Sequence, residues 1–430
     1  MKPPSTDLKP ASPEAGATVD HWLQWLESIH PTEIDLGLDR VLVVLRRLFP
    51  RKPAARIITV AGTNGKGTTV ATIEKLLRTA GRSVGAYTSP HLQSYNERVR
   101  LNGQQITDAA LVSAFERVEA ARGKVSLTYF EFGTLAAFVA FADAGVEDWV
   151  LEVGLGGRLD AVNVLDADYA VITSIDIDHV GFLGDNREVI GFEKAGILRR
   201  GIFAVCADPE PPSSVLQQAA AQKVELQVSG RDYRIEPIES DPSTLELVLD
   251  NEQIVLPAGP LPIESVAAGV VLGRKLVQQL SKDVVSEAVR TLTVPGRFEQ
   301  LRTGPDVIVD VGHNPHAARW LANKLAAKKP SPGRILGVYA ALADKDIAGV
   351  LTAMQPVVDQ WWFAGLDVPR GLGADALVDH AQACGLDRYS AVVSVDDALD
   401  AALAESTDLD TIVVFGSFYT VAQARERLAG

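Results

Sequence analysis

The sequence predicts an α/β protein built from two doubly wound, mostly parallel sheets. Short runs of β-branched and aliphatic residues alternate with helical patterns along most of the chain, which is typical of parallel sheets with helices on both faces. Apolar residues make up 47% and charged residues 22% of the 430 residues, close to the average for folded soluble proteins. Each domain is therefore long enough and apolar enough to build its own core.

The first domain is expected to span residues 18–294. Residues 1–17 precede it, and their content of proline, serine and charge predicts disorder. A strand is predicted from Arg56 to Ala61 and a helix from Thr68 to Ala80. A further strand, from Trp149 to Val153, leads into a glycine-rich loop.

A small antiparallel region is predicted between Glu225 and Leu256, where alternating segments flank the turn-forming residues 241–243. Helical patterns return from Ser265 to Thr291. The breakers in segment 293–296 then place the domain boundary between residues 294 and 295.

The second domain, residues 295–430, repeats the alternation on a smaller scale and is expected to be Rossmann-like. Its predicted strands are Val307–Val311, Ile335–Tyr339, Gln360–Ala364, Ala391–Val395 and Thr411–Phe415.

The charge and cysteine content exclude several classes of protein. The chain has 41 Lys and Arg against 55 Asp and Glu, a net charge of −14, which disfavours non-specific binding to nucleic acid. Cys206 and Cys384 are too few for a disulfide framework and favour a cytoplasmic protein. The start of the chain has no apolar signal segment, and no apolar run approaches the ~18 to 20 residues of a membrane span, so no membrane partner is expected.

A phosphate-binding loop is predicted between the first strand and its helix, where residues 62–69 read Gly-Thr-Asn-Gly-Lys-Gly-Thr-Thr. Glycines let backbone N–H groups turn toward phosphate oxygens, and Lys66 and the helix N-terminus add positive charge. Gly67 separates the lysine from the threonines, which departs from the general P-loop pattern. A glycine-rich turn without ligand is the alternative, but a turn needs neither the lysine nor three glycines. The residues expected to bind phosphate are Gly62, Thr63, Asn64, Gly65, Lys66, Gly67 and Thr68.

Further motifs follow this loop in order: Ser89–Leu92, Asn96–Arg100, Phe130–Glu131, Glu152–Asn163, Asp178–His179, Glu193–Ile197, Pro295–Phe298 and Asp310–His316. Together they resemble the folylpolyglutamate synthase and dihydrofolate synthase family, relatives of the Mur-type amide ligases. The resemblance runs from about Trp22 to Val421. It implies an N-terminal P-loop domain that binds ATP and a smaller Rossmann-like domain of the Mur ligase C-terminal type.

The resemblance implies two Mg²⁺ sites. Glu152 ends an apolar strand, where α/β sites assemble, although a solvated strand-end acid is equally compatible with the residue alone. The family match makes Glu152 and Ser89 ligands of one Mg²⁺. It makes His179 a ligand of the second Mg²⁺, although a lone histidine is more often structural. It also makes Lys194, as a carbamate, an oxygen ligand of the same ion. Lys66, His179 and Lys194 are expected to act in catalysis.

Two residues of the second domain are expected to bind ATP. Arg297 is suited to clamp phosphate oxygens, and Asp310 to accept hydrogen bonds from ribose hydroxyls. From the residues alone, Arg297 could instead form an interdomain salt bridge and Asp310 could cap the end of a strand. The resemblance favours a role in ATP binding for both residues. Where the family commonly has an asparagine near the adenine, this chain has Ser265, which leaves that contact open.

The resemblance also implies a pterin pocket. An aromatic ring stacks on a pterin, and a carboxylate accepts hydrogen bonds from its amino and ring N–H groups. Phe130 and Asp160 match these roles. Without the resemblance, Phe130 would be expected in the core and Asp160 would be expected to cap a loop. Leu127 and Thr128 together with Asp160 favour the bacterial type that accepts dihydropteroate as well as folates. The residues expected to line the pocket are Ser28, Ile29, His30, Pro31, Thr128, Phe130, Leu159, Asp160 and Ala161.

The expected activity is an ATP-dependent amide ligation that adds L-glutamate to 7,8-dihydropteroate and to tetrahydrofolates through an acyl phosphate, with two Mg²⁺ ions. A monofunctional folylpolyglutamate synthase and a Mur-type ligase with another acceptor, such as a cell-wall nucleotide, are the alternatives within this class. A nucleotide-binding switch without ligase activity is the alternative outside it. The chain is expected to act as a monomer.

Overall fold

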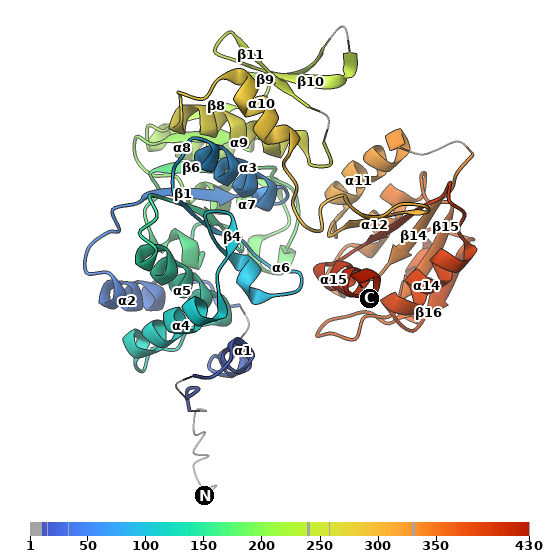
Figure 1. Ribbon diagram of the computed structural model, residues 1–430, viewed down its shortest axis with the longest axis horizontal. Coiled ribbons are helices and arrows are strands. Elements are labelled where there is room, and N and C mark those ends of the chain that lie inside the picture. The colour runs from blue at the N-terminus through green and yellow to red at the C-terminus, as the bar shows by residue number, and fades with distance from the viewer. Residues whose placement is uncertain are drawn as a thin grey trace, which may run out of the picture. The chain divides into compact units, whose positions relative to one another are not determined.

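The computed structural model describes residues 11–14, 16–32, 34–238, 241–257, 259–328 and 332–429. Most of the segment expected to be disordered, residues 1–10 and 15, therefore lies outside the described residues. The chain forms two compact units (Figure 1). The first comprises Met1–Ile177, Gly181–Pro257 and Glu264–Arg290, and the second comprises Asp178–Val180, Ala258–Ile263 and Thr291–Gly430.

The first unit is built on an eight-stranded sheet in the order β4-β3-β2-β5-β1-β6-β7-β8. Neighbouring strands from β2 to β8 are parallel, and β3 and β4 extend the β2 edge in antiparallel pairs. The carboxyl ends of the parallel strands β1, β5 and β6 therefore meet at one edge. The strands are β1 (Arg56–Ala61), β2 (Val84–Tyr87), β3 (Val99–Leu101), β4 (Gln104–Gln105), β5 (Asp148–Glu152), β6 (Tyr169–Ile172), β7 (Phe203–Cys206) and β8 (Glu225–Val228).

Helices cover both faces of this sheet (Figure 1). On one face lie α1 (Val19–Ser28), α2 (Asp39–Leu48), α4 (Asp108–Arg122) and α5 (Tyr129–Asp143), and on the other lie α3 (Lys66–Thr79), α9 (Ile263–Leu276) and α10 (Lys282–Arg290). The shorter helices are η1 (Tyr95–Arg98), η2 (Ala161–Val164), α6 (Val180–Leu183), α7 (Arg187–Ala195) and α8 (Ser213–Ala221). The doubly wound arrangement expected for this half of the chain is confirmed.

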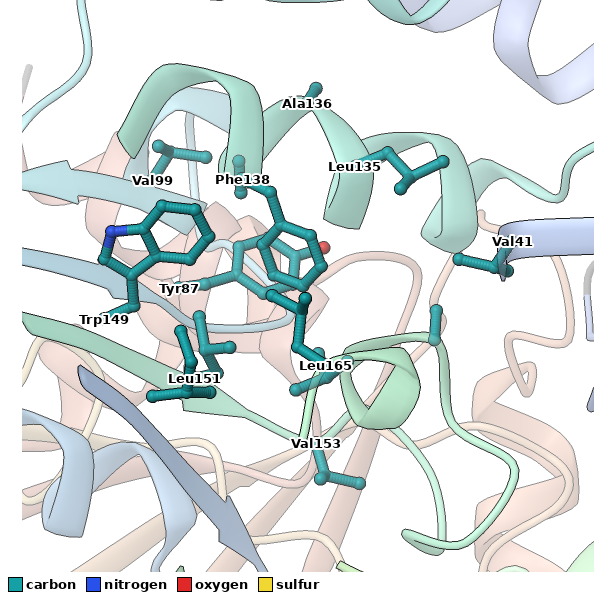
Figure 2. Packing of buried hydrophobic residues seen from close by; sticks show 14 of the residues in the cluster. Val41, Tyr87, Val99, Leu135, Ala136, Phe138, Trp149, Leu151, Val153 and Leu165 are labelled. Carbon is teal, nitrogen blue, oxygen red and sulfur yellow. The ribbon is translucent and has the colours of Figure 1, made fainter. Parts of the chain in front are cut away.

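The core of the first unit lies between the sheet and α5. Figure 2 shows Tyr87, Trp149 and Leu151 of the strands facing Phe138 of the helix. The rings of Phe138 and Trp149 are stacked with their centroids 5.7 Å apart. Such a helix is apolar on almost every side because it is buried between the sheet and the outer helices.

A separate antiparallel sheet is formed by β9 (Tyr233–Ile238), β10 (Asp241–Leu249) and β11 (Glu252–Leu256). The antiparallel region predicted over residues 225–256 is thus present from Tyr233 onward. The prediction is wrong for β8, which pairs with β7 in parallel. The reason is that α8 connects these two strands, and a helical crossover returns the chain in the same direction.

The second unit contains a six-stranded sheet in the order β12-β13-β17-β14-β15-β16, parallel except for β12 at its edge. Its strands are β12 (Glu299–Arg302), β13 (Asp306–Asp310), β14 (Ile335–Tyr339), β15 (Gln360–Ala364), β16 (Tyr389–Val392) and β17 (Thr411–Phe415). Its helices are α11 (Pro315–Lys328), α12 (Ile347–Met354) and α13 (Ala374–Ala383) on one face, and α14 (Val395–Glu405) and α15 (Phe418–Ala429) on the other (Figure 1).

One strand of the second unit differs from the prediction. The expected strand Ala391–Val395 is wrong at its end, because β16 stops at Val392 and Val395 is the first residue of α14. The Ser394 hydroxyl accepts a hydrogen bond from the backbone N–H of Asp397 and so starts the helix. Among the residues that the structure describes, no helix is long and apolar enough to cross a membrane.

Candidate active site

The predicted phosphate loop lies at the carboxyl end of β1 and leads into α3. Gly65 caps this helix with a φ of +86°, and a Cβ added there would stand 2.0 Å from the Ser265 hydroxyl oxygen. At Gly62, φ is +153° and a Cβ would stand 1.7 Å from the Thr173 hydroxyl. Both positions therefore require glycine. Ser265, which stands where the family commonly has an asparagine near the adenine, lies against the phosphate loop.

The segment after β6 holds the phosphate loop in shape. The backbone N–H of Thr63 donates to the Ser174 carbonyl at 2.7 Å, and the Thr173 hydroxyl donates to the Asn64 carbonyl at 2.7 Å. The Asn64 N–H donates to the Ser174 hydroxyl at 3.2 Å. Thr173 and Ser174 were not predicted to have a role, although two hydroxyl residues directly after a buried strand are a usable signal.

Lys66 is the first residue of α3, and its ammonium lies over the loop. It donates to the carbonyl oxygens of Gly62 at 3.1 Å and Thr63 at 3.2 Å. The same positive charge lowers the pKa of the Asp160 carboxyl, although burial has the larger, opposite effect. The lysine is thus near both the phosphate loop and a residue of the expected pterin pocket.

Glu152 ends β5, next to β1 in the sheet, and is only 5% exposed. Its Oε2 accepts the Ser89 backbone N–H at 3.2 Å and lies 3.7 Å from the position of a Cβ on Gly67. A buried carboxylate beside a phosphate loop fits Mg²⁺, which takes oxygen ligands and keeps waters and phosphate oxygens. Within the described ranges no three His, Cys, Asp or Glu side chains gather as a metal centre. A metal here would therefore depend on Glu152, the Ser89 hydroxyl and substrate oxygens.

The two residues expected at the second metal belong to different units. Lys194 lies in the last turn of α7 and is 3% exposed, so it is not a solvated surface lysine. His179 has a φ of +52° and belongs to the segment Asp178–Val180, which groups with the second unit. Lys194 groups with the first unit, so a metal shared by these two residues stays a prediction.

Arg297 and Asp310 lie together at the carboxyl end of β13. Asp310 is 3% exposed, and its two oxygens accept the N–H groups of Phe298 at 2.9 Å and Gly312 at 2.7 Å. Burial raises the pKa of Asp310, and the charge of Arg297 partly opposes this. The Arg297 guanidinium carbon stands 5.5 Å from the centre of the Phe418 ring. Asp310 therefore caps its strand end, and its role toward ATP stays a prediction.

Phe130 and Asp160 come together in the first unit. Phe130 is half-buried in the first turn of α5, and its ring covers Gly154, where a Cβ would stand 2.6 Å from the ring. The backbone of Gly154 in turn lies close enough to Asp160 to lower the pKa of its carboxyl, although burial has the larger, opposite effect. Leu159, half-buried, and Ala161, buried, flank Asp160. The aromatic ring and the carboxylate expected of a pterin pocket are therefore joined through one glycine.

The Asp160 carboxylate is 2% exposed and serves as a cap. It accepts the N–H groups of Leu155 at 2.8 Å and Val162 at 3.0 Å and so starts η2. Burial raises the pKa of Asp160 to about 6, and these backbone donors limit the rise. Each carboxylate oxygen has two lone pairs, so capping leaves acceptor capacity for a ligand.

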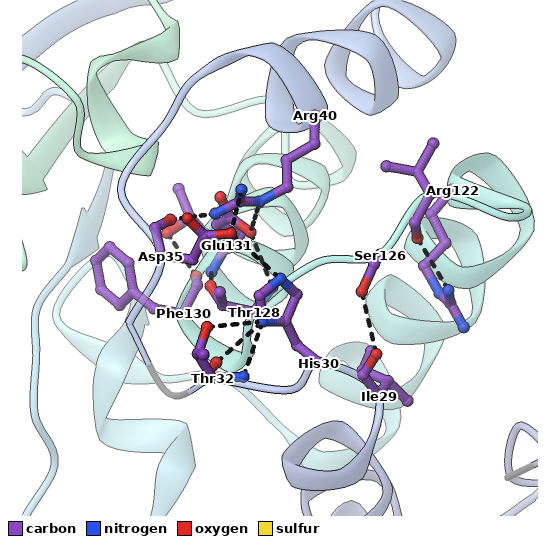
Figure 3. Close-up of polar contacts among 12 residues, drawn as sticks. Ile29, His30, Thr32, Asp35, Arg40, Arg122, Ser126, Thr128, Phe130 and Glu131 are labelled. Atoms are coloured by element: carbon purple, nitrogen blue, oxygen red, sulfur yellow. Dashed lines mark hydrogen bonds and ion pairs between the residues drawn. The ribbon is translucent and has the colours of Figure 1, made fainter. Parts of the chain in front are cut away.

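The other wall of the expected pocket is only partly formed by the predicted residues. The Ile29 carbonyl accepts the Ser126 hydroxyl at 3.1 Å, which ties segment 28–31 to the chain before Thr128, the N-cap of α5 (Figure 3). Pro31 and Ser28 are exposed, and the Ser28 hydroxyl donates to the Trp25 carbonyl in its own helix. The structure therefore brings Ile29 to Ser126, two residues before Thr128, and leaves the Ser28 hydroxyl in α1.

Arg40 connects this wall to α5 (Figure 3). Its Nε donates to Glu131 at 2.8 Å and its Nη1 to Asp35 at 2.6 Å. Glu131 accepts the Thr128 N–H at 2.8 Å, and the His30 ring nitrogen lies 3.5 Å from the Asp35 carboxylate. Arg40 was not predicted to have a role, because an arginine in the first turn of a helix carries no signal of a partner far along the chain.

Comparison with known proteins places the chain in a family. Residues 60–252 match the Mur ligase middle domain, and residues 296–418 match the family described as Mur ligase, glutamate ligase domain. The dihydrofolate synthase/folylpolyglutamate synthase of Escherichia coli (strain K12) is 43% identical over 415 residues, which cover 96% of each chain. The chain belongs to the dihydrofolate synthase/folylpolyglutamate synthase family.

Solved structures of dihydrofolate synthase/folylpolyglutamate synthases have the same fold. An E. coli protein in complex with DHPP and ADP has a TM-score of 0.92 and 42% identity, and covers 97% of this chain and 99% of its own. A bifunctional folylpolyglutamate synthase/dihydrofolate synthase with Mn, AMPPNP and L-glutamate bound has a TM-score of 0.89 and 40% identity, and covers 98% of this chain and 100% of its own. The resemblance seen in the sequence is confirmed, and the chain is an ATP-dependent ligase.

Proposed function

We propose that the chain adds L-glutamate to 7,8-dihydropteroate and to tetrahydrofolates in an ATP-dependent ligation. The observation that carries the proposal is that the phosphate loop after β1 and Glu152 at the end of β5 lie at one edge of the sheet, with Asp160 in the loop that follows β5. Burial raises the pKa of Asp160, and the nearby charge of Lys66 lowers it. A phosphate donor and a pterin acceptor would then bind side by side. Relatives solved with DHPP and ADP, and with AMPPNP and L-glutamate, support this choice of substrates.

In the first step, a carboxylate oxygen of the acceptor attacks the γ-phosphorus of ATP, and the bond from that phosphorus to the ADP oxygen breaks. The N–H groups of the phosphate loop and the Lys66 ammonium hold the phosphates and stabilise the charge that spreads over the transferred group. Phe130 and Asp160 would fix the pterin so that the acceptor carboxylate stays aligned for attack.

In the second step, the free amino group of glutamate attacks the carbonyl carbon of the acyl phosphate. The tetrahedral intermediate collapses as the carbon–oxygen bond to phosphate breaks, phosphate leaves with the bonding electrons, and the nitrogen loses a proton. In the second unit, Arg297 and Asp310 are our candidates to bind ATP, with phosphate oxygens and ribose hydroxyls as their respective partners.

We assign two Mg²⁺ sites to the chain. Ser89 and Glu152 would hold the first ion, and His179 and Lys194 the second, with Lys194 carbamylated so that it presents oxygen instead of a cation. Bound Mg²⁺ neutralises phosphate charge during phosphoryl transfer. The burial of Lys194 supports this assignment. Taking an ammonium group out of water costs free energy, whereas the negative charge of a buried carbamate would be compensated by the bound metal ion.

Incorporation of labelled glutamate, measured in parallel with dihydropteroate and with a tetrahydrofolate, tests the proposal. The wild type should incorporate glutamate into both acceptors. Lys66→Ala should lose activity by about a hundredfold or more, because a charge on the transferred phosphoryl is removed. Lys75→Ala, a matched change farther along α3, should keep it.

Each alternative gives a different result in this assay. Incorporation into the folate alone would identify a monofunctional folylpolyglutamate synthase, and incorporation into neither would favour a Mur-type ligase with another acceptor. Phosphate release that does not depend on glutamate would favour a nucleotide switch. Full activity in a folded Lys66→Ala variant would refute the role of the phosphate loop.

We further infer a monomer in the cytoplasm. Cys206 and Cys384 are both free thiols, as expected in a reducing compartment. Light scattering at working concentration tests the first inference, and fractionation of cells tests the second.

A further inference from the structure

The segment after β2 carries Ser89 toward Glu152 and is called here the Ser89 loop (residues 88–94). Its Ser89 N–H donates to the Glu152 carboxylate at 3.2 Å. The loop has no regular secondary structure, yet it must hold the Ser89 side chain within reach of a metal on Glu152. Contacts from the chain that follows the loop supply this rigidity.

Glu97 makes the most direct of these contacts. Its Oε2 accepts the Leu92 N–H at 2.8 Å, and its Oε1 accepts the N–H groups of Gln93 and Ser94, each at 2.9 Å. The bond to Ser94 belongs to the capping box of η1. The bonds to Leu92 and Gln93 are not needed for a cap, and they reach into the Ser89 loop.

Two arginines near Glu97 anchor the rest of the Ser89 loop. The Nε of Arg98 donates to the His91 ring at 2.8 Å. The Nη1 of Arg100 donates to the Thr88 hydroxyl at 3.0 Å, and its Nη2 donates to Glu74 on α3 at 2.8 Å. The loop is therefore fixed at Thr88, at His91 and at the three N–H groups that Glu97 binds.

We propose that Glu97 is a positioning residue for the metal: by binding three consecutive N–H groups, it fixes the Ser89 loop so that the Ser89 hydroxyl reaches the ion held by Glu152. The inference rests on the proposed function, in which Ser89 and Glu152 bind one Mg²⁺. It assigns a role in metal binding to a carboxylate that does not itself touch the metal.

Glu97 can fix the Ser89 loop because its side chain is a carboxylate. Its two oxygens satisfy three donors, and charge-assisted bonds of this kind are stronger than neutral ones. Glutamine at position 97 would keep one oxygen and turn an NH₂ group toward the loop donors, so at least one loop N–H would lose its partner. The Ser89 loop would then sample several conformations, and the metal would lose a fixed ligand.

Binding of Mn²⁺ to the full-length chain in the presence of AMPPNP, followed by electron paramagnetic resonance, tests the proposal. Glu97→Gln should raise the apparent dissociation constant for Mn²⁺ on the order of tenfold, the lower end of the range for residues that orient metal ligands. Ser89→Ala should raise it as well. The matched control is Glu147→Gln, because Glu147 binds the Ser83 N–H at 3.0 Å at the opposite end of β2. Its Mn²⁺ affinity should equal that of the wild type.

A second measurement separates positioning from general loss of structure. Ligase activity of Glu97→Gln should return toward the wild-type value as Mg²⁺ is raised, while its melting temperature without nucleotide stays close to that of Glu147→Gln. Should Glu97→Gln fail to fold, Glu97→Asp is measured instead, since it keeps the charge but shortens the reach. Weaker Mn²⁺ binding in Glu97→Asp supports the proposal, and wild-type binding overturns it.

The outcomes distinguish this inference from the proposed function. Weaker binding in Ser89→Ala with wild-type binding in Glu97→Gln overturns the role of Glu97 and leaves the metal site standing. Wild-type binding in both Ser89→Ala and Glu152→Gln overturns the metal site, and the inference with it. If Glu97→Gln and Glu147→Gln lose Mn²⁺ affinity equally, the loss reflects lower stability of the protein, which also overturns the inference.

Discussion

At Asp160, burial and ligand chemistry set opposite requirements. Burial raises the pKa of this carboxyl to about 6, whereas the role that we propose for it, accepting hydrogen bonds from pterin N–H groups, is served best by the ionised form. With a pKa of about 6, about 99% of the group is ionised at pH 8 and about a quarter at pH 5.5. Asp160 is therefore an acceptor at neutral pH and becomes a donor in mild acid.

We expect the affinity for dihydropteroate to fall about fourfold between pH 8 and pH 5.5, in proportion to the ionised fraction of Asp160. The sign follows from the raised pKa, since acid protonates the carboxyl and turns an O–H toward the pterin donors. Fluorescence titration at each pH measures the dissociation constant. Asp160→Asn should bind weakly at every pH. If this variant retains the wild-type pH dependence, another group is titrating.

Residues with a local signal could be predicted from the sequence, and residues with distant partners could not. The phosphate loop is recognisable because its glycines, lysine and flanking strand and helix all lie within one short segment. Arg40 and Glu131 are 91 positions apart in the chain, so neither residue reveals the other. The Glu97 carboxylate was part of a family motif, but its bonds to the Ser89 loop depend on how the chain turns after β2.

Among the elements, α3 has a left-handed glycine at each end, with different surroundings. Gly65 at its start has a φ of +86° and the Ser265 side chain against it, whereas Gly81 just past its end has a φ of +78° and nothing within 4 Å. We expect Gly65→Ala to weaken AMPPNP binding at least about tenfold, because both backbone strain and the clash move the loop N–H groups. Gly81→Ala should cost only about 1 kcal/mol of stability and leave binding unchanged. Calorimetric titration and thermal melting measure the two quantities.

A double-mutant cycle separates the clash from the strain in Gly65→Ala. Ser265→Gly removes the hydroxyl that a Cβ would meet, so Gly65→Ala should cost less affinity in that background than in the wild type. Equal costs in both backgrounds would mean that strain alone is responsible.

Strands β1 and β5 of the first unit, and all strands of the second unit's sheet except β12, could be predicted because a buried parallel strand is a short apolar run. The errors occur where a single residue or a single connection determines the structure or the direction of a segment. Ser394 starts a helix inside an apparently continuous β-like run, and the direction of β8 depends on the helix before it rather than on its own residues. The edge strand β12 carries no apolar pattern, since its residues are Glu299, Gln300, Leu301 and Arg302.

For the whole molecule, the important feature is that each unit has its own core. The sheet of the first unit packs on one hydrophobic cluster with α4 and α5, and that of the second packs on another with α11, α12 and α13. Separate cores allow separate unfolding transitions. A change confined to one core should then lower one transition and leave the other in place.

Two buried aspartates provide matched probes of these cores. Asp148, at the start of β5, is fully buried and accepts from Arg56 and Arg82. Asp410, just before β17, is 3% exposed and accepts the Arg334 backbone N–H at 2.7 Å and its guanidinium at 2.9 Å. Both carboxylates lie at the amino ends of strands, away from the site residues, so neither should be needed for catalysis.

We expect Asp148→Asn to lower only the transition of the first unit and Asp410→Asn only that of the second. Each loses a charge-assisted bond worth about 2 kcal/mol, which corresponds to about 3 °C for the longer first unit and about 6 °C for the shorter second unit. Differential scanning calorimetry resolves the two transitions, and their enthalpies assign them, because the first unit is the longer of the two and the enthalpy of unfolding scales with the number of residues. A single transition that both substitutions lower equally would mean that the two cores unfold together.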